Sequence, residues 1–210
     1  MEIVVVDYGM GNLRSVSKAL EHVAPGAVVK VTARPEDLRS ASHVVVPGQG
    51  AMPDCMRELR SRGLADAVSE AAGSKPFLGI CIGLQMLFDF SEEGGVKGLS
   101  LIPGSVRRFP PGLAGGEGVR LKIPHMGWNE VVQLRPHALW DGIADSSRFY
   151  FVHSYYADEA EDGLASGRCT YGLPFTAAIA RDNMFAVQFH PEKSQAAGLQ
   201  LLRNFVYWRP

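Results

Sequence analysis

The chain has 210 residues and a formal net charge of −1, with 46% hydrophobic and 20% charged residues. This composition can build a sizeable core and is unlike that of a disordered chain. The near-neutral charge argues against a nucleic acid or an anionic membrane as partner, and no apolar run approaches the ~20 residues of a membrane span.

Strand and helix patterns alternate through the first half of the chain. Continuous apolar, β-branched runs predict strands buried on both faces at residues 2–7, 44–46 and 77–80. Apolar residues at helical spacing predict helices over residues 12–23 and 51–72. We therefore expect one domain, residues 1–210, of the α/β class: a doubly wound, flavodoxin-like, mostly parallel sheet with right-handed crossovers.

The second half carries shorter signals. Glycine and proline are frequent from residue 94 to 118, which predicts turns and short strands. Short β-type runs predict antiparallel additions to the sheet at residues 119–123, 129–133, 149–152, 168–171 and 177–181. A last strand over residues 184–189 leads to His190, and Ser194 is expected to cap a closing helix.

The apolar run before Cys81 ends between two glycines, Gly79 and Gly83. A strand, a sharp turn and a helix start would expose this thiol at the end of the sheet, as the nucleophile elbow G-x-S-x-G does for a serine. Backbone N–H groups at a helix start also favour a thiolate. Most free cysteines are small buried hydrophobes, and that is the interpretation we prefer for Cys55 and Cys169.

A histidine and a carboxylate stand two residues apart near the C-terminus, as His190 and Glu192. Pro191 biases His190 to an extended backbone, so that Glu192 can project toward the same space. His190 would then take the proton of the Cys81 thiol and return it to the leaving amine, while Glu192 orients the imidazole. One histidine and one glutamate fall short of a zinc set, so these residues predict a Cys-His-Glu hydrolase without a metal.

The segment from Pro47 to Gly50 follows the second predicted strand and precedes a helix. A plain turn would explain it. The functional alternative is an oxyanion hole, because Gly48 and Gly50 let backbone N–H groups approach a tetrahedral intermediate. The second donor would be the N–H of Ile82, the residue after the nucleophile.

Other features bear on cofactors and location. Residues 7–15 place glycines between a strand and a helix, but Arg14 occupies the third glycine position of a dinucleotide fingerprint, which argues against NAD and FAD. The first seven residues are too short and too soon acidic for a secretory signal, and three widely spaced cysteines fit no disulfide framework. We expect no cofactor and a cytoplasmic protein with free thiols.

The motifs around Cys81, Gly50 and His190 resemble those of the class I, or triad, glutamine amidotransferases, in the same order. Within that class, residues 7–13, 124–129, 150–155 and 190–194 are similar to the glutaminase subunits of imidazole glycerol phosphate synthases, of histidine biosynthesis. The resemblance implies hydrolysis of glutamine to glutamate and ammonia through a thioester on Cys81. Ammonia would pass to a (β/α)8 cyclase partner in a heterodimer, which makes imidazole glycerol phosphate and an aminoimidazole carboxamide ribotide.

The same resemblance assigns further residues. The glutamine would be held by Gly48, Gly50, Gln85, Ser154 and Tyr155. The cyclase and the ammonia exit would be faced by Asn12, Met126, Trp128, Tyr150 and Lys193. The oxyanion loop departs from the common Pro-Gly-Val-Gly by having Gln49 at its third place. We hypothesise that the partner complex switches this loop into its active arrangement.

Two alternatives stay open at this point. One is another triad glutaminase, serving anthranilate or pyridoxal phosphate synthesis, which would use the same chemistry. The other is a flavodoxin-like module in which Cys81 is inert or senses redox state. From the residues alone, the pairing of His190 with Glu192 is what argues against the second.

Overall fold

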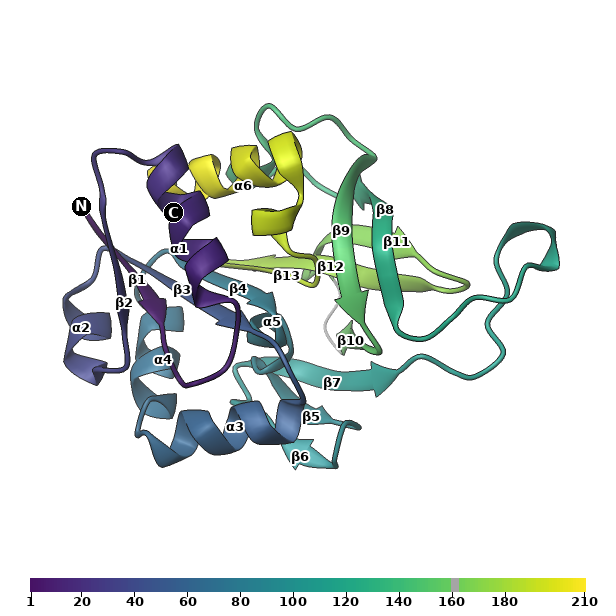
Figure 1. Ribbon diagram of the computed structural model, residues 1–210, viewed down its shortest axis with the longest axis horizontal. Coiled ribbons are helices and arrows are strands. Elements are labelled where there is room, and N and C mark those ends of the chain that lie inside the picture. The colour runs from purple at the N-terminus through teal and green to yellow at the C-terminus, as the bar shows by residue number, and fades with distance from the viewer. Residues whose placement is uncertain (160–162) are drawn as a thin grey trace.

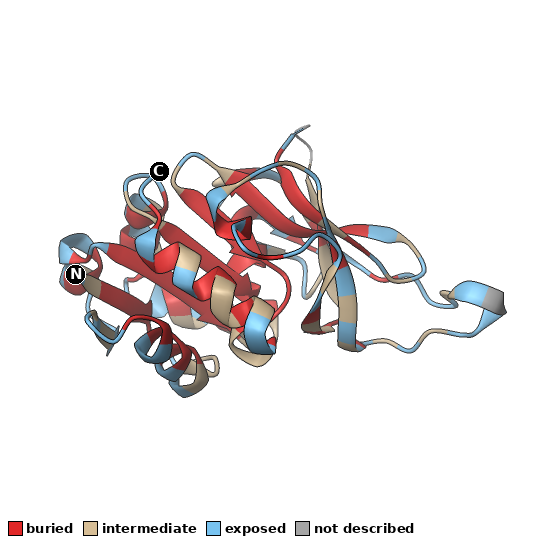
Figure 2. Cartoon of the chain, turned by 90° about the horizontal axis from the view of Figure 1, so that it is seen from above, coloured by how far each residue is buried: buried red, intermediate tan, exposed pale blue. Residues whose placement is uncertain are grey.

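Parallel strands form one half of the sheet in the computed structural model, which describes residues 1–159 and 163–210 (Figure 1). Their spatial order is β2 (Val28–Thr32), β1 (Glu2–Val6), β3 (His43–Gly48), β4 (Phe77–Cys81) and β13 (Met184–Val187). The middle strands are buried almost throughout, as strands covered on both faces must be (Figure 2). The predicted doubly wound α/β fold is confirmed.

Helices cover both faces of this parallel half (Figure 1). One face carries α1 (Leu13–Val23) and α6 (Gln195–Tyr207), and the other carries α2 (Pro35–Ser40), α3 (Met52–Ser61) and α4 (Ala65–Ala72). No helix in the described part of the chain is both long and apolar enough to cross a membrane.

The single helix predicted over residues 51–72 is wrong, because α3 and α4 are separate. Gly63 lies between them with a φ of +67°, a conformation that ends a helix. The apolar spacing nevertheless runs on across the break, since Leu59, Leu64 and Val68 are all fully buried. Periodicity in the sequence therefore predicted the buried face and missed the turn.

Antiparallel strands extend the sheet on the other side of β13, as predicted. The main path continues through β12 (Pro174–Arg181), β10 (Tyr155–Glu159), β7 (Ile102–Arg108), β5 (Phe88–Ser91) and β6 (Val96–Lys97), although β5 and β7 are parallel to each other. A branch from β12 holds β11 (Ala165–Thr170), β8 (His125–Gln133) and β9 (Ser147–His153). The described residues also form the 3-10 turns η1 (Gly116–Gly118), η2 (Ala138–Trp140) and η3 (Pro191–Lys193).

The strand predicted at residues 119–123 is wrong. These residues lie in a long arm between β7 and β8 that projects from the body of the molecule (Figure 1). Ala114 and Arg120 form one isolated bridge, and Val119 is exposed. Within residues 1–159 and 163–210, no strand lies beside these β-type residues to complete a ladder.

Ser194 directly precedes α6 but does not cap it with its side chain. Its hydroxyl instead donates to the carbonyl oxygen of His190 at 2.6 Å and accepts the N–H of Tyr150 at 3.0 Å. The N–H of His190 also donates to Tyr150, at 2.9 Å. The residue predicted to start a helix therefore helps to fasten His190 to β9.

Candidate active site

Cys81 is the last residue of β4 and directly precedes the single helical turn α5 (Ile82–Gln85). Its backbone angles, φ 55° and ψ −107°, are unusual for a residue other than glycine and cost about 1–3 kcal/mol. Strained geometry of this kind is typical of a nucleophile elbow. The prediction that the thiol is exposed is wrong: Cys81 is only 4% exposed and is reached through a cavity.

The two glycines beside Cys81 let α5 lie directly on the neighbouring strands. A Cβ atom on Gly83 would lie far inside contact distance of the Val46 carbonyl oxygen in β3. A Cβ atom on Gly79 would stand 2.7 Å from the Gly83 carbonyl oxygen. Both clashes involve backbone atoms, which cannot rotate away, so glycine is required at both positions.

Gly83→Ala is therefore expected to destabilise the protein by about 3 kcal/mol or more, at the upper end of overpacking effects. Gly26→Ala is the matched control, because a Cβ atom there meets nothing within 4 Å. Its effect should stay within about 0.5 kcal/mol. Urea denaturation of both variants measures the difference, and a Gly83→Ala protein as stable as the control would contradict the tight packing of α5.

His190 and Glu192 form a buried pair after β13. His190 Nδ1 lies 2.9 Å from Glu192 Oε1, and both side chains are shielded from solvent. Burial acts to lower the pKa of His190, but hydrogen bonding and charge from Cys81 and Glu192 outweigh it and raise the pKa to about 10. His190 Nε2 has no fully formed hydrogen bond among the described residues, a looseness common before substrate is bound.

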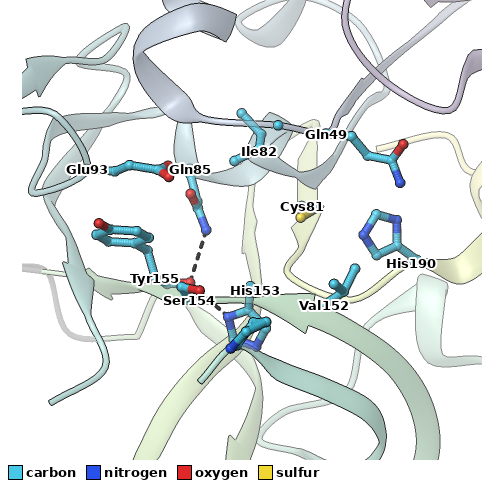
Figure 3. Close-up of a pocket in the computed structure, with 12 residues that line it drawn as sticks. Gln49, Cys81, Ile82, Gln85, Glu93, Val152, His153, Ser154, Tyr155 and His190 are labelled. Carbon is cyan, nitrogen blue, oxygen red and sulfur yellow. Dashed lines mark hydrogen bonds between the residues drawn. The ribbon is translucent and has the colours of Figure 1, made fainter. Parts of the chain in front are cut away.

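Cys81 and His190 lie side by side in the wall of a cavity of about 380 Å³ (Figure 3). This volume is of the size that takes a small-molecule ligand. Predicted site residues in its wall are Gly50, Cys81, Ile82, Gln85, Ser154, Tyr155 and His190. Gly48 does not line it: a Cβ atom there would stand 2.5 Å from the Ile82 side chain and 2.7 Å from the hydroxyl of Tyr8. Gly48 thus lies beneath the elbow.

The loop from Pro47 to Gly50, predicted to form an oxyanion hole, is held at two carbonyl groups. Tyr8 donates its hydroxyl to the carbonyl oxygen of Pro47 at 2.8 Å, and the Cys55 thiol donates to that of Gln49 at 3.4 Å. Gly50 has a φ of +105°, which glycine adopts without strain. Ile82 begins α5, so its N–H has no partner within that helix.

The other two thiols are poor nucleophiles. Burial raises the pKa of Cys55 to about 11 and that of Cys169 to about 12, and neither residue lines the cavity. Both therefore remain protonated near neutral pH.

Two glutamines link the cavity wall to Cys81, and only one of them was expected. Gln85 Nε2 donates to Gln188 Oε1 at 3.0 Å and to the carbonyl oxygen of Tyr155 at 3.1 Å. Gln188 Nε2 in turn lies 3.6 Å from Cys81 Sγ. Sequence reasoning missed Gln188, although a polar residue between apolar strand residues and His190 was a signal that could have identified it.

Sequence reasoning also missed Gln49, Glu93, Pro124, Val152 and His153 as lining residues. Glu93 brings a carboxylate to the end of the cavity away from His190 (Figure 3). Its Oε2 atom accepts the N–H of Met52 at 2.9 Å, which holds the side chain in place. No local motif marks Glu93, because its position depends on the long-range placement of β5.

Four of the residues that were expected to face a partner lie together. Met126 and Trp128 are exposed on β8, at 61% and 37%. Trp128 pairs with Tyr150 of β9, and the Lys193 ammonium group lies 5.9 Å from the Tyr150 ring centre. Asn12 instead caps α1 and borders a small internal cavity beside Glu192.

Comparisons with known proteins extend over nearly the whole chain. The family described as Glutamine amidotransferase class-I matches residues 4–208. Imidazole glycerol phosphate synthase subunit HisH of Nitrosospira multiformis is 64% identical, covering 100% of this chain and 99% of its own, and that of Dechloromonas aromatica is 65% identical, covering 99% and 97%.

Solved structures share the fold at lower identity. A crystal structure of a glutamine amidotransferase is 21% identical with a TM-score of 0.71, covering 97% of this chain and 96% of its own. The structure of PurLQS from Thermotoga maritima is 17% identical with a TM-score of 0.73, covering 98% and 97%. Likeness at this level shows the fold alone.

Proposed function

The chain belongs to the class-I glutamine amidotransferase family, and we propose that it is the glutaminase subunit of imidazole glycerol phosphate synthase in histidine biosynthesis. The observation that carries the proposal is the cavity in which Cys81 faces His190, itself paired with Glu192. The high identity to HisH relatives over their full length selects this synthase over anthranilate or pyridoxal phosphate synthesis.

Chemistry begins when Cys81 Sγ attacks the side-chain carbonyl carbon of glutamine. A C–S bond forms, and the carbonyl electrons move to oxygen, where the N–H groups of Gly50 and Ile82 stabilise the negative charge. Collapse of this intermediate breaks the C–N bond, and His190 protonates the departing amine, which leaves as ammonia. Water, deprotonated by His190, then cleaves the thioester and releases glutamate.

The raised pKa of His190 suits both steps. In the resting site the imidazolium lies near two groups that favour its charge, Cys81 and Glu192, so it holds a proton that it can give to the amine. When the thioester has formed, Cys81 carries no charge and His190 loses one of these two partners. It then becomes a better base toward water, as the second half of the reaction requires.

Polar groups of the wall match the ends of glutamine. The buried Gln85 Oε1 has no partner among the described residues and is free to accept an N–H from a ligand. Glu93 offers the negative charge that an α-ammonium group pairs with. No lysine or arginine occurs among the described lining residues, which suits a small amino acid better than a phosphorylated substrate.

The cyclase partner binds, in this proposal, at the surface patch formed by Met126, Trp128, Tyr150 and Lys193. Exposed Met and Trp side chains with a nearby cation are typical of protein interfaces. Docking there would form a heterodimer and shield ammonia from water. We also propose that partner binding switches the loop from Pro47 to Gly50 into its active arrangement. The enzyme is proposed to be cytoplasmic, a location that three unbridged cysteines favour.

Labelling with a diazo-ketone analogue of glutamine tests the proposed chemistry. Mass spectrometry of the complex with the cyclase is expected to find one adduct, on Cys81, and glutamine should block it. Cys55 and Cys169 serve as internal controls and should stay unmodified, because burial keeps them protonated. Labelling without glutamine protection would indicate a reactive thiol of another kind.

Reconstitution tests the assignment to a synthase. Mixed with the cyclase and its nucleotide ligand, the chain should support glutamine-dependent formation of imidazole glycerol phosphate. Support of anthranilate or pyridoxal phosphate synthesis instead would overturn the assignment. If the isolated chain hydrolysed saturating glutamine as fast as the complex does, the switching of the loop by the partner would be wrong.

A further inference from the structure

Two buried histidines that take no part in this chemistry lie beside the active-site cavity. His125 begins β8 and His153 ends β9, and they face each other as a cross-strand pair. His125 Nδ1 and His153 Nε2 are 2.9 Å apart. Both residues are shielded from solvent, and His153 also lines the cavity (Figure 3).

The surroundings determine which ring nitrogen carries each hydrogen. His153 Nδ1 lies 2.8 Å from the carbonyl oxygen of Tyr155, which can only accept, so this nitrogen is the donor. Burial lowers the pKa of His125 to about 4 and that of His153 to about 3, so both rings are neutral near pH 7. A neutral ring has one N–H, so His153 Nε2 accepts and His125 Nδ1 donates to it.

Asn129 lies at the far end of this series of hydrogen bonds, on the side of His125. His125 Nε2 must be an acceptor, and the Asn129 Nδ2 group lies 3.3 Å from it. The same amide donates to the carbonyl oxygen of Thr170 at 2.9 Å, and its Oδ1 accepts the N–H of Glu130 at 2.8 Å. These two backbone partners fix the orientation of the amide. All donors therefore point one way, from Asn129 through both histidines to Tyr155.

Aromatic rings hold the two imidazoles in place. His125 stacks on Tyr171 and on Phe151, with ring centres 4.0 and 4.9 Å apart. The centres of Phe109 and Phe175 lie 5.2 and 5.1 Å from that of His153. Neither imidazole can turn without moving closely packed neighbours, so the series is rigid.

The series ends on a carbonyl group that also holds a residue of the glutamine pocket. The Tyr155 oxygen accepts from His153 and from Gln85 Nε2, and the second hydrogen of the Gln85 amide goes to Gln188. With both hydrogens used, Gln85 presents its Oε1 atom as the free acceptor. Anything that shifts the Tyr155 carbonyl would also shift this oxygen.

We propose that His125 and His153 are positioning residues of the glutaminase, whose one-way hydrogen-bond series fixes the Tyr155 carbonyl and, through it, the Gln85 amide oxygen that receives the substrate. The inference rests on the proposed function, because it takes glutamine as the ligand of Gln85. Neither histidine transfers a proton in the reaction. Loss of the series therefore weakens substrate binding more than it slows the chemistry.

Substitution of His153 in the complex with the cyclase tests this role. His153→Leu removes both hydrogen bonds and should raise the KM for glutamine about 5- to 10-fold, with kcat changed by less than about twofold. His153→Asn keeps an N–H near the place of Nδ1 and should recover most of the wild-type KM. His43→Leu, which removes a buried histidine whose Nε2 lies 3.0 Å from the Arg209 guanidinium and which does not line the cavity, is the matched control and should leave KM unchanged.

An unchanged KM in His153→Leu, or a His153→Asn protein no better than His153→Leu, would overturn the inference. A second test uses ¹⁵N NMR of the histidine-labelled chain near neutral pH, which should find both rings neutral with their hydrogens on Nδ1. A hydrogen on Nε2 of either ring would overturn the series. Because NMR needs no activity, an inactive wild-type complex would contradict the proposed function while the ring hydrogens still decide the inference.

Discussion

Cys81→Ala is expected to abolish glutamine-dependent activity, with a fall in kcat/KM of roughly 10⁴-fold or more. The substitution removes the sulfur atom that would form the thioester. Alanine is smaller than cysteine, so it adds no contact at the strained elbow between β4 and α5. Synthesis with added ammonia should continue at the wild-type rate, because that reaction belongs to the cyclase. Glutamate release and ammonia-dependent synthesis by the complex measure the two activities separately.

Cys169→Ala is the matched control for this variant. The Cys169 thiol is buried in β11, burial raises its pKa to about 12, and it does not line the cavity. Its removal should leave both activities within about twofold of the wild type. Equal loss of glutamine-dependent and ammonia-dependent synthesis in Cys81→Ala would indicate a defect of folding or of the interface and would contradict the nucleophilic role.

His190→Ala should cost nearly as much as Cys81→Ala, whereas Glu192→Gln should cost roughly 10- to 100-fold less than His190→Ala. Alanine leaves no group to take the thiol proton or to protonate the amine. Glutamine can still accept the hydrogen of His190 Nδ1 through its amide oxygen, so the ring keeps its orientation and loses only the charge beside it. Steady-state kinetics of the complex give this order directly.

A second measurement separates the charge of Glu192 from its role in orienting the His190 ring. Charge from this carboxylate helps to raise the pKa of His190, so Glu192→Gln should lower that pKa from its wild-type value of about 10. An NMR titration of the His190 ring follows this change. A greater loss of activity in Glu192→Gln than in His190→Ala would undermine the roles given to the two residues.

Local sequence patterns were enough to find features whose interacting residues lie close together along the chain. Buried apolar runs predicted the parallel strands β1, β3 and β4, because a strand covered on both faces has to be apolar throughout. Gly79 and Gly83 marked the elbow, and backbone atoms of Val46 and Gly83 explain why no larger residue fits. Likewise, His190 and Glu192 stand two residues apart and bond directly.

Local patterns were misleading where a residue's partner is remote. Ser194 has the side chain of a helix cap, yet its hydroxyl bonds instead to the carbonyl oxygen of His190 and to the N–H of Tyr150 on β9. Residues 119–123 have the composition of a strand, but no strand in the described part of the chain lies beside them. Leu59, Leu64 and Val68 keep helical spacing across a turn. Burial requires apolar residues on one face, but it does not require the helix to be continuous.

The residues that surround Cys81 could be identified only from the folded chain. Gln85 and Gln188 are 103 positions apart and meet because β13 lies beside β4 in the sheet. His125 and His153 meet because β8 pairs with β9. A sequence reveals chemistry wherever the cooperating groups are neighbours along the backbone. Groups that are distant along the chain come together only through the order of the strands in the sheet. Because buried polar groups must find hydrogen-bond partners, that order also determines how the side chains around the pocket are arranged.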